Sequence, residues 1–268
     1  MEAFLGQINS IIWGSALIYL CLGTGLYFSV RTKFLQVRHF QHMLSIMREG
    51  RSSESGVSSF QALAMSLSGR MGTGNIAGVA TAIAMGGPGA VFWMWMVAFL
   101  GASTAYVEAT LAQIYKEKDD NGEYRGGPAY FIEKAMGQNW YAWLFAASTI
   151  IAVGFCLPGI QANSIVAAMG NAWSIPPLAT SSLIALGVAI IIFGGVKRIA
   201  HFAQVVVPAM AMGYILIAFA VIGANIEQFP AVINLIVKSA FGLDAGFGAI
   251  IGMAVQWGVK RGVYSNEE

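Results

Sequence analysis

Charged residues are scarce in this sequence. Asp, Glu, Lys and Arg make up 10% of the 268 residues, against about 25% in soluble globular domains, and 57% of the residues are hydrophobic. A chain with so few charges cannot cover a water-facing surface. Together with the long apolar runs, this composition predicts an all-α integral membrane protein that crosses the bilayer several times.

Cysteine and recognisable catalytic motifs are also scarce. Cys21 and Cys156 lie inside apolar runs, without metal-ligand spacing or a disulfide framework. No HExxH motif, GxSxG motif or pair of intramembrane aspartates is present, which argues against an intramembrane enzyme. The net charge of +2 is spread through the loops, so we expect no nucleic-acid partner. We therefore expect no catalytic residue and no cofactor.

Long apolar runs predict about seven transmembrane helices, because a bilayer helix needs about 20 residues. The runs cover residues 11–30, 58–85, 90–115, 141 onward, 178–196, 202–223 and 247–259. Pro158 should interrupt the fourth run, and residues 229–241 are too irregular to assign. Residues 34–47 predict an interfacial amphipathic helix, residues 116–125 a solvated loop, and Pro128 the start of a short helix.

The Lys and Arg residues predict the orientation. Nearly all of them lie in the loops that follow odd-numbered runs or at the end of the last run, and these positions share one side of the membrane. Lys238 lies on the opposite side of the membrane, and Arg70 lies inside a run. Basic loops stay in the cytoplasm, so the N-terminus is expected outside the cell.

The second run has an unusual centre. Three glycines, Gly69, Gly72 and Gly74, lie there beside Arg70 and Asn75. Glycine lets the backbone leave the helical conformation, and peptide groups released in the bilayer must be buried in protein or line a cavity. The pattern predicts a broken helix whose free amides and carbonyls bind a small zwitterion together with a cation.

A structural alternative is a glycine-rich helix packed closely on its neighbours, because Gly74 and Gly78 form a small-xxx-small pair. Arg70 argues against it, since an unpaired guanidinium in hydrocarbon costs at least about 2.5–3.5 kcal/mol. Arg70 could replace a cation or pair with Glu108, and Glu108 could instead extend to the membrane surface.

Five motifs occur in a familiar order. They are SSFQAL at residues 58–63, GTGNIAGVA at 72–80, GGPGAVFWMW at 86–95, GGPAYF at 126–131 and WGVKRGVYSNE at 257–267. Together they resemble the alanine or glycine:cation symporter family, also called the sodium:alanine symporters. The resemblance covers nearly the whole chain.

The resemblance implies sodium-coupled uptake of alanine, glycine or a similar small neutral amino acid by alternating access, in a bacterial inner or archaeal plasma membrane. It also implies a LeuT-type inverted repeat. Residues 1–57 would hold an additional helix and the interfacial helix, residues 58–225 the first five-helix repeat, and residues 226–268 the start of the second repeat. The chain is expected to be a fragment that ends at the break of that repeat and does not transport alone.

The resemblance also implies roles for individual residues. The substrate would be held by the broken helix and by the expected second break, that is, by Gly72, Thr73, Gly74, Tyr264, Ser265 and Asn266. Sodium would be bound by the Asn75 side chain and by the carbonyls of Arg70 and Met71.

Two alternatives remain open at this stage. Gln161, on the fourth run, could reach the substrate or could cap loose backbone. For Asn163, two residues further on, we favour a structural role. The other functional class is an ion channel with GTGN carbonyls as a filter, although filters usually arise from symmetric rings of such loops.

Overall fold

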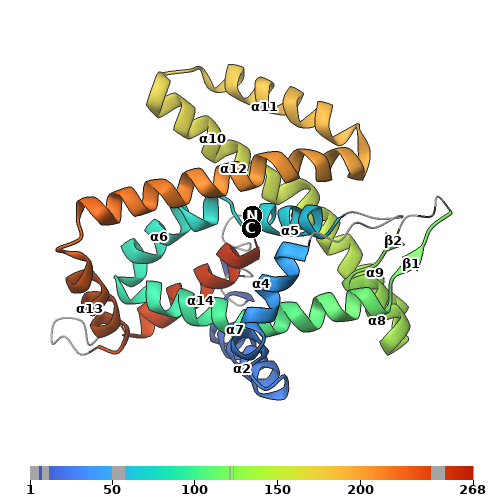
Figure 1. Ribbon diagram of the computed structural model, residues 1–268, viewed down its shortest axis with the longest axis horizontal. Coiled ribbons are helices and arrows are strands. Elements are labelled where there is room, and N and C mark those ends of the chain that lie inside the picture. The colour runs from blue at the N-terminus through green and yellow to red at the C-terminus, as the bar shows by residue number, and fades with distance from the viewer. Residues whose placement is uncertain are drawn as a thin grey trace. The chain divides into compact units, whose positions relative to one another are not determined.

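The computed structural model describes residues 6–7, 12–49, 58–120, 122, 124–242 and 251–267. Most of them are helical (Figure 1). The first half of the chain forms α2 Ser15–Arg31, α3 Leu35–Arg38, α4 Phe40–Glu49, α5 Ser59–Ser68, the 3-10 turn η1 Thr73–Asn75, α6 Ala77–Gly86 and α7 Gly89–Ile114. The second half forms α8 Pro128–Met136, α9 Asn139–Thr149, η2 Ile150–Cys156, α10 Leu157–Trp173, α11 Pro177–Ile192, α12 Gly195–Ala224, α13 Phe229–Ala240 and α14 Ile251–Glu267.

The chain divides into two compact units. The first comprises Met1–Leu44, Gly74–Tyr106 and Met212–Glu268, and the second comprises Ser45–Thr73 and Val107–Ala211. The division between Thr73 and Gly74 falls inside the region where the sequence predicts a broken helix.

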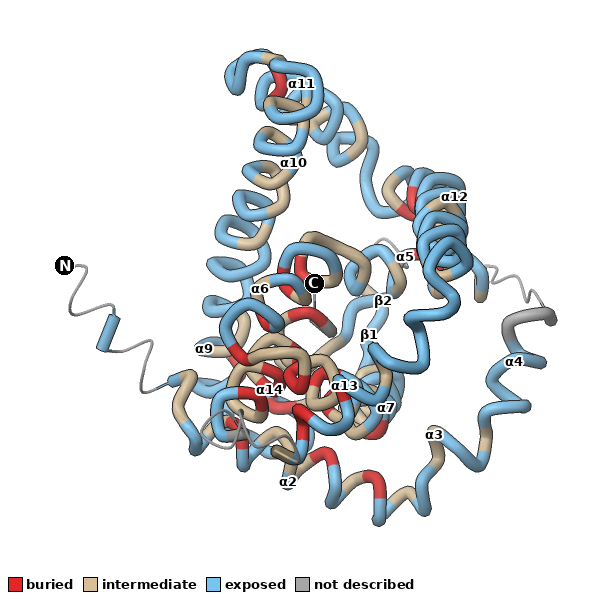
Figure 2. Tube along the Cα trace, turned by 90° about the vertical axis from the view of Figure 1, so that its left-hand side faces the viewer, coloured by how far each residue is buried: buried red, intermediate tan, exposed pale blue. Residues whose placement is uncertain are grey.

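Among the described residues, three helical segments are long and apolar enough to cross a membrane. They are α7, the continuous segment Asn139–Trp173 and α12, and four shorter apolar helices accompany them: α2, α6, α11 and α13. Many large apolar side chains on these helices are exposed, including Leu178, Trp143 and Phe219. Figure 2 shows mostly exposed residues along α10 and α11. Apolar helices with apolar exposed faces confirm the predicted helical membrane class.

The expected interruption at Pro158 is wrong. Residues Asn139–Trp173 stay helical throughout, and the seven residues of η2 form a π-helix that leads directly into α10. Pro158 lies in the first turn of α10. The proline is accommodated inside the continuous helix because the π-helix before it is wider than an α-helix, which makes room for the proline ring.

Several predicted boundaries also change. The predicted loop at residues 116–125 contains two short antiparallel strands, β1 Glu117–Lys118 and β2 Tyr124–Arg125. Residues 229–241, left unassigned, hold α13. Lys197 and Arg198 lie in the first turn of α12 and not in a loop. The predicted helix at Pro128 is confirmed, with the proline in its first turn.

The last predicted helix also differs. Residues 247–250 lie outside the described part of the chain, and α14 extends to Glu267. Lys260 and Arg261 therefore lie within this helix and not at its end, which removes them from the count of loop charges. Helical geometry also continues through Tyr264–Asn266, so the expected second break is not found within the described part of α14.

Glycines let α14 pack closely on α6 and α7, within the first unit (Figure 1). A Cβ atom at Gly258 would lie 2.6 Å from the Ala90 carbonyl oxygen, and one at Gly262 would lie 3.1 Å from the Val97 Cβ. Gly258 and Gly262 form a small-xxx-small pair, which allows helix backbones to approach. The structural alternative expected such packing at Gly78, where a Cβ would meet open space. The close packing is found on α14, at a glycine pair that was not predicted.

The core of the first unit lies around this contact. Val259 is packed with Ile18 of α2 and Val97 of α7, and a second cluster joins Ala82, Ala90 and Met94. Figure 2 shows buried residues gathered on α14 and neighbouring helices. This packing fixes α14 against the helix that follows the break.

Gly258→Ala should lower the free energy of unfolding by roughly 1–3 kcal/mol, the cost of overpacking a close contact. The added methyl group would strike backbone, which cannot move aside as a side chain can. Thermal unfolding of the purified protein measures the change. Gly252→Ala is the matched control on the same helix, because its Cβ would meet open space, and an equal loss in both variants would contradict the packing argument.

Candidate functional site

The predicted interruption of the second apolar run is present. Helix α5 begins with a capping box between Ser58 and Gln61 and ends at Ser68, and α6 begins at Ala77. The last turn of α5 is tightened, because the Arg70 N–H donates to the Leu67 carbonyl oxygen at 3.0 Å. Between the two helices lie a bend and the 3-10 turn η1.

This interruption places backbone groups outside either helical ladder. The carbonyls of Arg70 and Met71 fall between the end of α5 and the start of η1. At the other side, Ile76 is the N-cap of α6 and provides no side-chain cap for the first amides of that helix. Carbonyls and amides that lie outside a helical ladder at one interruption are the groups that bind a cation and an anion respectively in folds with broken membrane helices.

Gln161 of α10 is hydrogen-bonded to the interruption within the second unit. Its Oε1 atom accepts from the Thr73 N–H at 3.1 Å and also from the Thr73 hydroxyl. The side chain thereby satisfies one of the backbone donors that the interruption releases. Gln161 thus caps loose backbone in this structure, and its contact with the substrate stays a prediction.

Gly72 gives Gln161 its space. A Cβ at Gly72 would lie 2.6 Å from the Gln161 Nε2 atom and 3.3 Å from its Cδ and Oε1 atoms. The backbone of Gly72 does not have a positive φ, so the conformation itself would accept an alanine. Glycine is needed here for close approach and not for an unusual backbone angle.

Asn75 and Ser265 meet in the first unit. The Ser265 hydroxyl donates to the Asn75 Oδ1 atom at 2.8 Å, and Ser265 is 4% exposed. The sequence assigned these residues to different ligands, Asn75 to sodium and Ser265 to the substrate. Their contact brings two oxygen atoms that suit a hard cation to one place, across helices far apart in the chain.

Comparison with known proteins places this geometry in context. The sequence model of the sodium:alanine symporter family matches residues 1–268. The chain belongs to this family. The resemblance predicted from the five motifs is thereby confirmed.

Named relatives support the assignment. YrbD of Bacillus subtilis is 60% identical over 267 residues, which are 100% of this chain and 55% of YrbD. A sodium/proton-dependent alanine carrier protein of Bacillus sp. PS3 is 53% identical, over 84% of this chain and 50% of the relative. The sodium/alanine symporter AgcS of Methanococcus maripaludis is 41% identical, over 99% of this chain and 60% of AgcS.

This chain thus spans about half to three fifths of the length of these relatives. The family consists of symporters and not of enzymes or channels. Family membership together with the apolar helices indicates a multi-pass protein of the cell membrane.

The other predicted site residues of this symporter-family chain lie on or beside the same elements. Gly74 is buried in η1, Met71 is half-buried, and the Arg70 side chain is exposed. Tyr264 lies on α14, with the Arg261 guanidinium carbon 6.0 Å from its ring centroid. The side chain of Asn266 lies outside the described part of the structure.

Sequence reasoning missed both pairings. Thr73 and Gln161 are separated by 88 residues, and Asn75 and Ser265 by 190, so no local pattern connects them. The only sequence signal was composition, namely amide and hydroxyl side chains inside otherwise apolar runs, where polar groups need partners.

Gly72→Ala should act through Gln161. The new methyl group would push the Gln161 amide off Thr73 and lower the free energy of unfolding by about 1 kcal/mol, the contribution of a typical hydrogen bond. In a Gln161→Ala background, the same change should cost close to nothing. Thermal unfolding of the wild type, both single variants and the double variant measures this coupling.

Gly78→Ala is the control for this cycle, because it adds the same methyl group in open space on α6. It should leave stability unchanged or raise it by up to about 1 kcal/mol, through the better helix propensity of alanine. An equal cost of Gly72→Ala in both backgrounds would show that the alanine acts on the backbone and not on Gln161.

Proposed function

We propose that the complete protein is a secondary active transporter that couples inward movement of sodium to uptake of alanine, glycine or a similar small neutral amino acid. The observation that carries the proposal is the interruption between Ser68 and Ala77 in a chain of the symporter family. A membrane helix keeps such an interruption only where protein or bound ligand satisfies its peptide groups.

The substrate carboxylate would bind the amides of the interruption, at Gly72, Thr73 and Gly74. In the described structure, the Thr73 N–H already donates to the Gln161 Oε1 atom. A carboxylate oxygen is a stronger acceptor than an amide oxygen, so the substrate would take the place of Gln161 on Thr73. Before the substrate binds, Gln161 would occupy the carboxylate's place and accept the hydrogen bond of the Thr73 N–H.

Sodium would bind through neutral oxygens. The Asn75 Oδ1 atom and the Ser265 hydroxyl oxygen are joined by a hydrogen bond, and both are neutral oxygens of the kind that bind a hard cation. The carbonyls of Arg70 and Met71 are the further ligands that we propose. Tyr264 and Asn266 are retained as substrate-side residues.

The proposed fold is the LeuT-type inverted repeat with the N-terminus outside. Helix α2 is the additional N-terminal helix, residues 58–225 form the first repeat, and α14 opens the second. The interruption lies in the second apolar run of the chain, which is the run that follows α2, and this position supports the division. The sodium named for AgcS and the alanine named for two relatives support the choice of ion and substrate.

Uptake into proteoliposomes tests the proposal with the complete gene product. Labelled alanine should enter saturably when sodium is imposed outside, and unlabelled glycine should compete. Replacing sodium by potassium should abolish uptake, whereas a proton gradient alone should not restore it. A sodium-independent flux that does not saturate would overturn the symport proposal.

The Asn75 and Ser265 pair gives a sharper test of the ion site. Asn75→Ala should raise the sodium concentration for half-maximal uptake by about tenfold, the factor given by about 1.4 kcal/mol for a ligand to a charge. Ser265→Ala should raise it less, because it removes the weaker hydroxyl ligand.

The effect of the double variant should be smaller than the product of the two single effects, because the two residues are hydrogen-bonded to each other and serve one ion. Ser239→Ala is the matched control, since Ser239 is also a buried serine but its hydroxyl has no hydrogen-bond partner in the described structure. If the effects of the Asn75 and Ser265 substitutions simply multiply, the two residues do not share an ion.

A further inference from the structure

Helix α2 has two opposite faces. Ile18, Gly25 and Ser29 are buried at helical spacing against the first unit. The other face is exposed along its length and carries Tyr19, Leu20, Leu26, Tyr27 and Val30, which are between 52% and 75% exposed. In a multi-pass membrane protein, such a continuous apolar stripe indicates contact with lipid.

The exposed face is hollowed. Two adjoining hollows of about 370 and 310 Å³ share Gly23 and Tyr27, and between them they extend from Tyr19 to Arg31. A Cβ at Gly23 would meet nothing within 4 Å, so the missing side chain of Gly23 contributes to the groove.

The length of the groove fits a lipid chain. Residues 19–31 cover about 18 Å along the helix axis at about 1.5 Å per residue. One leaflet of the hydrocarbon core is about 15 Å deep, half of the roughly 30 Å of the whole core. The groove is therefore long enough to hold an acyl chain that crosses one leaflet, with its headgroup at the Arg31 end of the helix.

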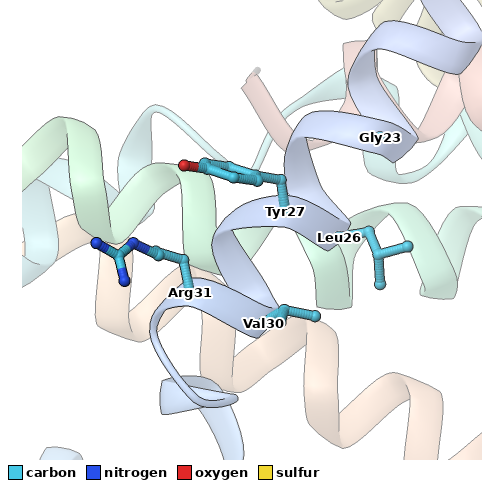
Figure 3. Close-up of a pocket in the computed structure, with 5 residues that line it drawn as sticks. All are labelled: Gly23, Leu26, Tyr27, Val30 and Arg31. Atoms are coloured by element: carbon cyan, nitrogen blue, oxygen red, sulfur yellow. The ribbon is translucent and has the colours of Figure 1, made fainter.

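Positive charge marks that end. Figure 3 shows the Arg31 guanidinium and the Tyr27 hydroxyl group directed to the same side of α2, with Leu26 and Val30 on the other. Lys33 follows two residues later and is exposed. No Asp or Glu occurs between residues 14 and 48, so this region has unbalanced positive charge that favours an anionic group.

A strained turn fixes this end of α2. The Phe34 N–H donates to the Ser29 carbonyl oxygen at 2.7 Å and the Lys33 N–H to that of Val30 at 3.0 Å, which is a Schellman motif. Lys33 and Phe34 both adopt left-handed conformations, with φ of 55° and 51°, each costing about 1–2 kcal/mol outside glycine.

Buried polar contacts hold α2 in place. The Ser29 hydroxyl donates to the Ser103 hydroxyl of α7 at 3.1 Å, and the Gln36 Nε2 atom donates to Ser29 at 3.0 Å. Because this network anchors the end of α2, the groove and the basic residues keep a fixed relation to each other.

We propose that this face of α2 is a binding site for an anionic phospholipid. One acyl chain lies in the groove over Gly23, and the phosphate contacts Arg31 and Lys33. The proposal commits to a bilayer lipid because the groove is apolar, runs along the axis of an apolar helix and ends in unbalanced positive charge. It depends on the membrane class of the protein and not on the transported substrate.

Native mass spectrometry of the purified complete protein tests this site. Phosphatidylglycerol and phosphatidylcholine with identical acyl chains are titrated, and inorganic phosphate is the third probe. The wild type should prefer phosphatidylglycerol. Arg31→Gln should reduce that preference by about fivefold, the contribution of one basic side chain near an anionic surface, and Arg31→Lys should retain most of it.

Gly23→Leu should weaken binding of both lipids without changing their ratio, because it fills the groove and leaves the charge. Gly213→Leu is the matched control, because Gly213 is another helical glycine whose Cβ would meet open space. It should change neither the binding of the two lipids nor their ratio. An unchanged lipid ratio in Arg31→Gln, unchanged lipid binding in Gly23→Leu, or equal competition by inorganic phosphate would each overturn the proposal. Alanine uptake is measured separately, so failure of transport would not count against the lipid site.

Discussion

The structure depends on one constraint: every backbone polar group inside a bilayer must find a partner within the protein or a bound ligand. A regular helix meets this condition by itself, which is why apolar helices dominate the chain. The exception is the interval between Ser68 and Ala77, where the helical hydrogen bonds stop. Here the Thr73 N–H donates to the side chain of Gln161 on α10. That exception marks the candidate site.

The two polar pairs, Thr73 with Gln161 and Asn75 with Ser265, satisfy different kinds of group at this interval. Gln161 supplies an acceptor to Thr73, and Ser265 supplies a donor to Asn75. In the function that we propose, each pair exchanges a protein partner for a ligand: a substrate carboxylate would replace the Gln161 oxygen, and sodium would bind the Asn75 oxygen together with the Ser265 hydroxyl. Neutral side chains suit this exchange, because they release a ligand more readily than a fixed charge would.

Close packing of α14 makes the second pair possible. Gly258 and Gly262 bring that helix against α7 so closely that a methyl group would collide at Gly258 and would be tightly packed at Gly262. Ser265 lies on the same helix, one turn further on, and its position beside Asn75 follows from this packing. The small residues therefore do more than fill space: they set the distance between side chains that the chain order separates by 190 residues.

The sequence by itself determined the helical membrane class, the family and the interruption of the second apolar run. These follow from local properties, namely length, polarity and the conformational freedom of glycine. It misjudged Pro158, because the wider π-helix before the proline makes room for its ring within a continuous helix. Only the tertiary structure decided which partners Thr73 and Asn75 have and where glycine permits contact, since these depend on packing between helices remote in sequence.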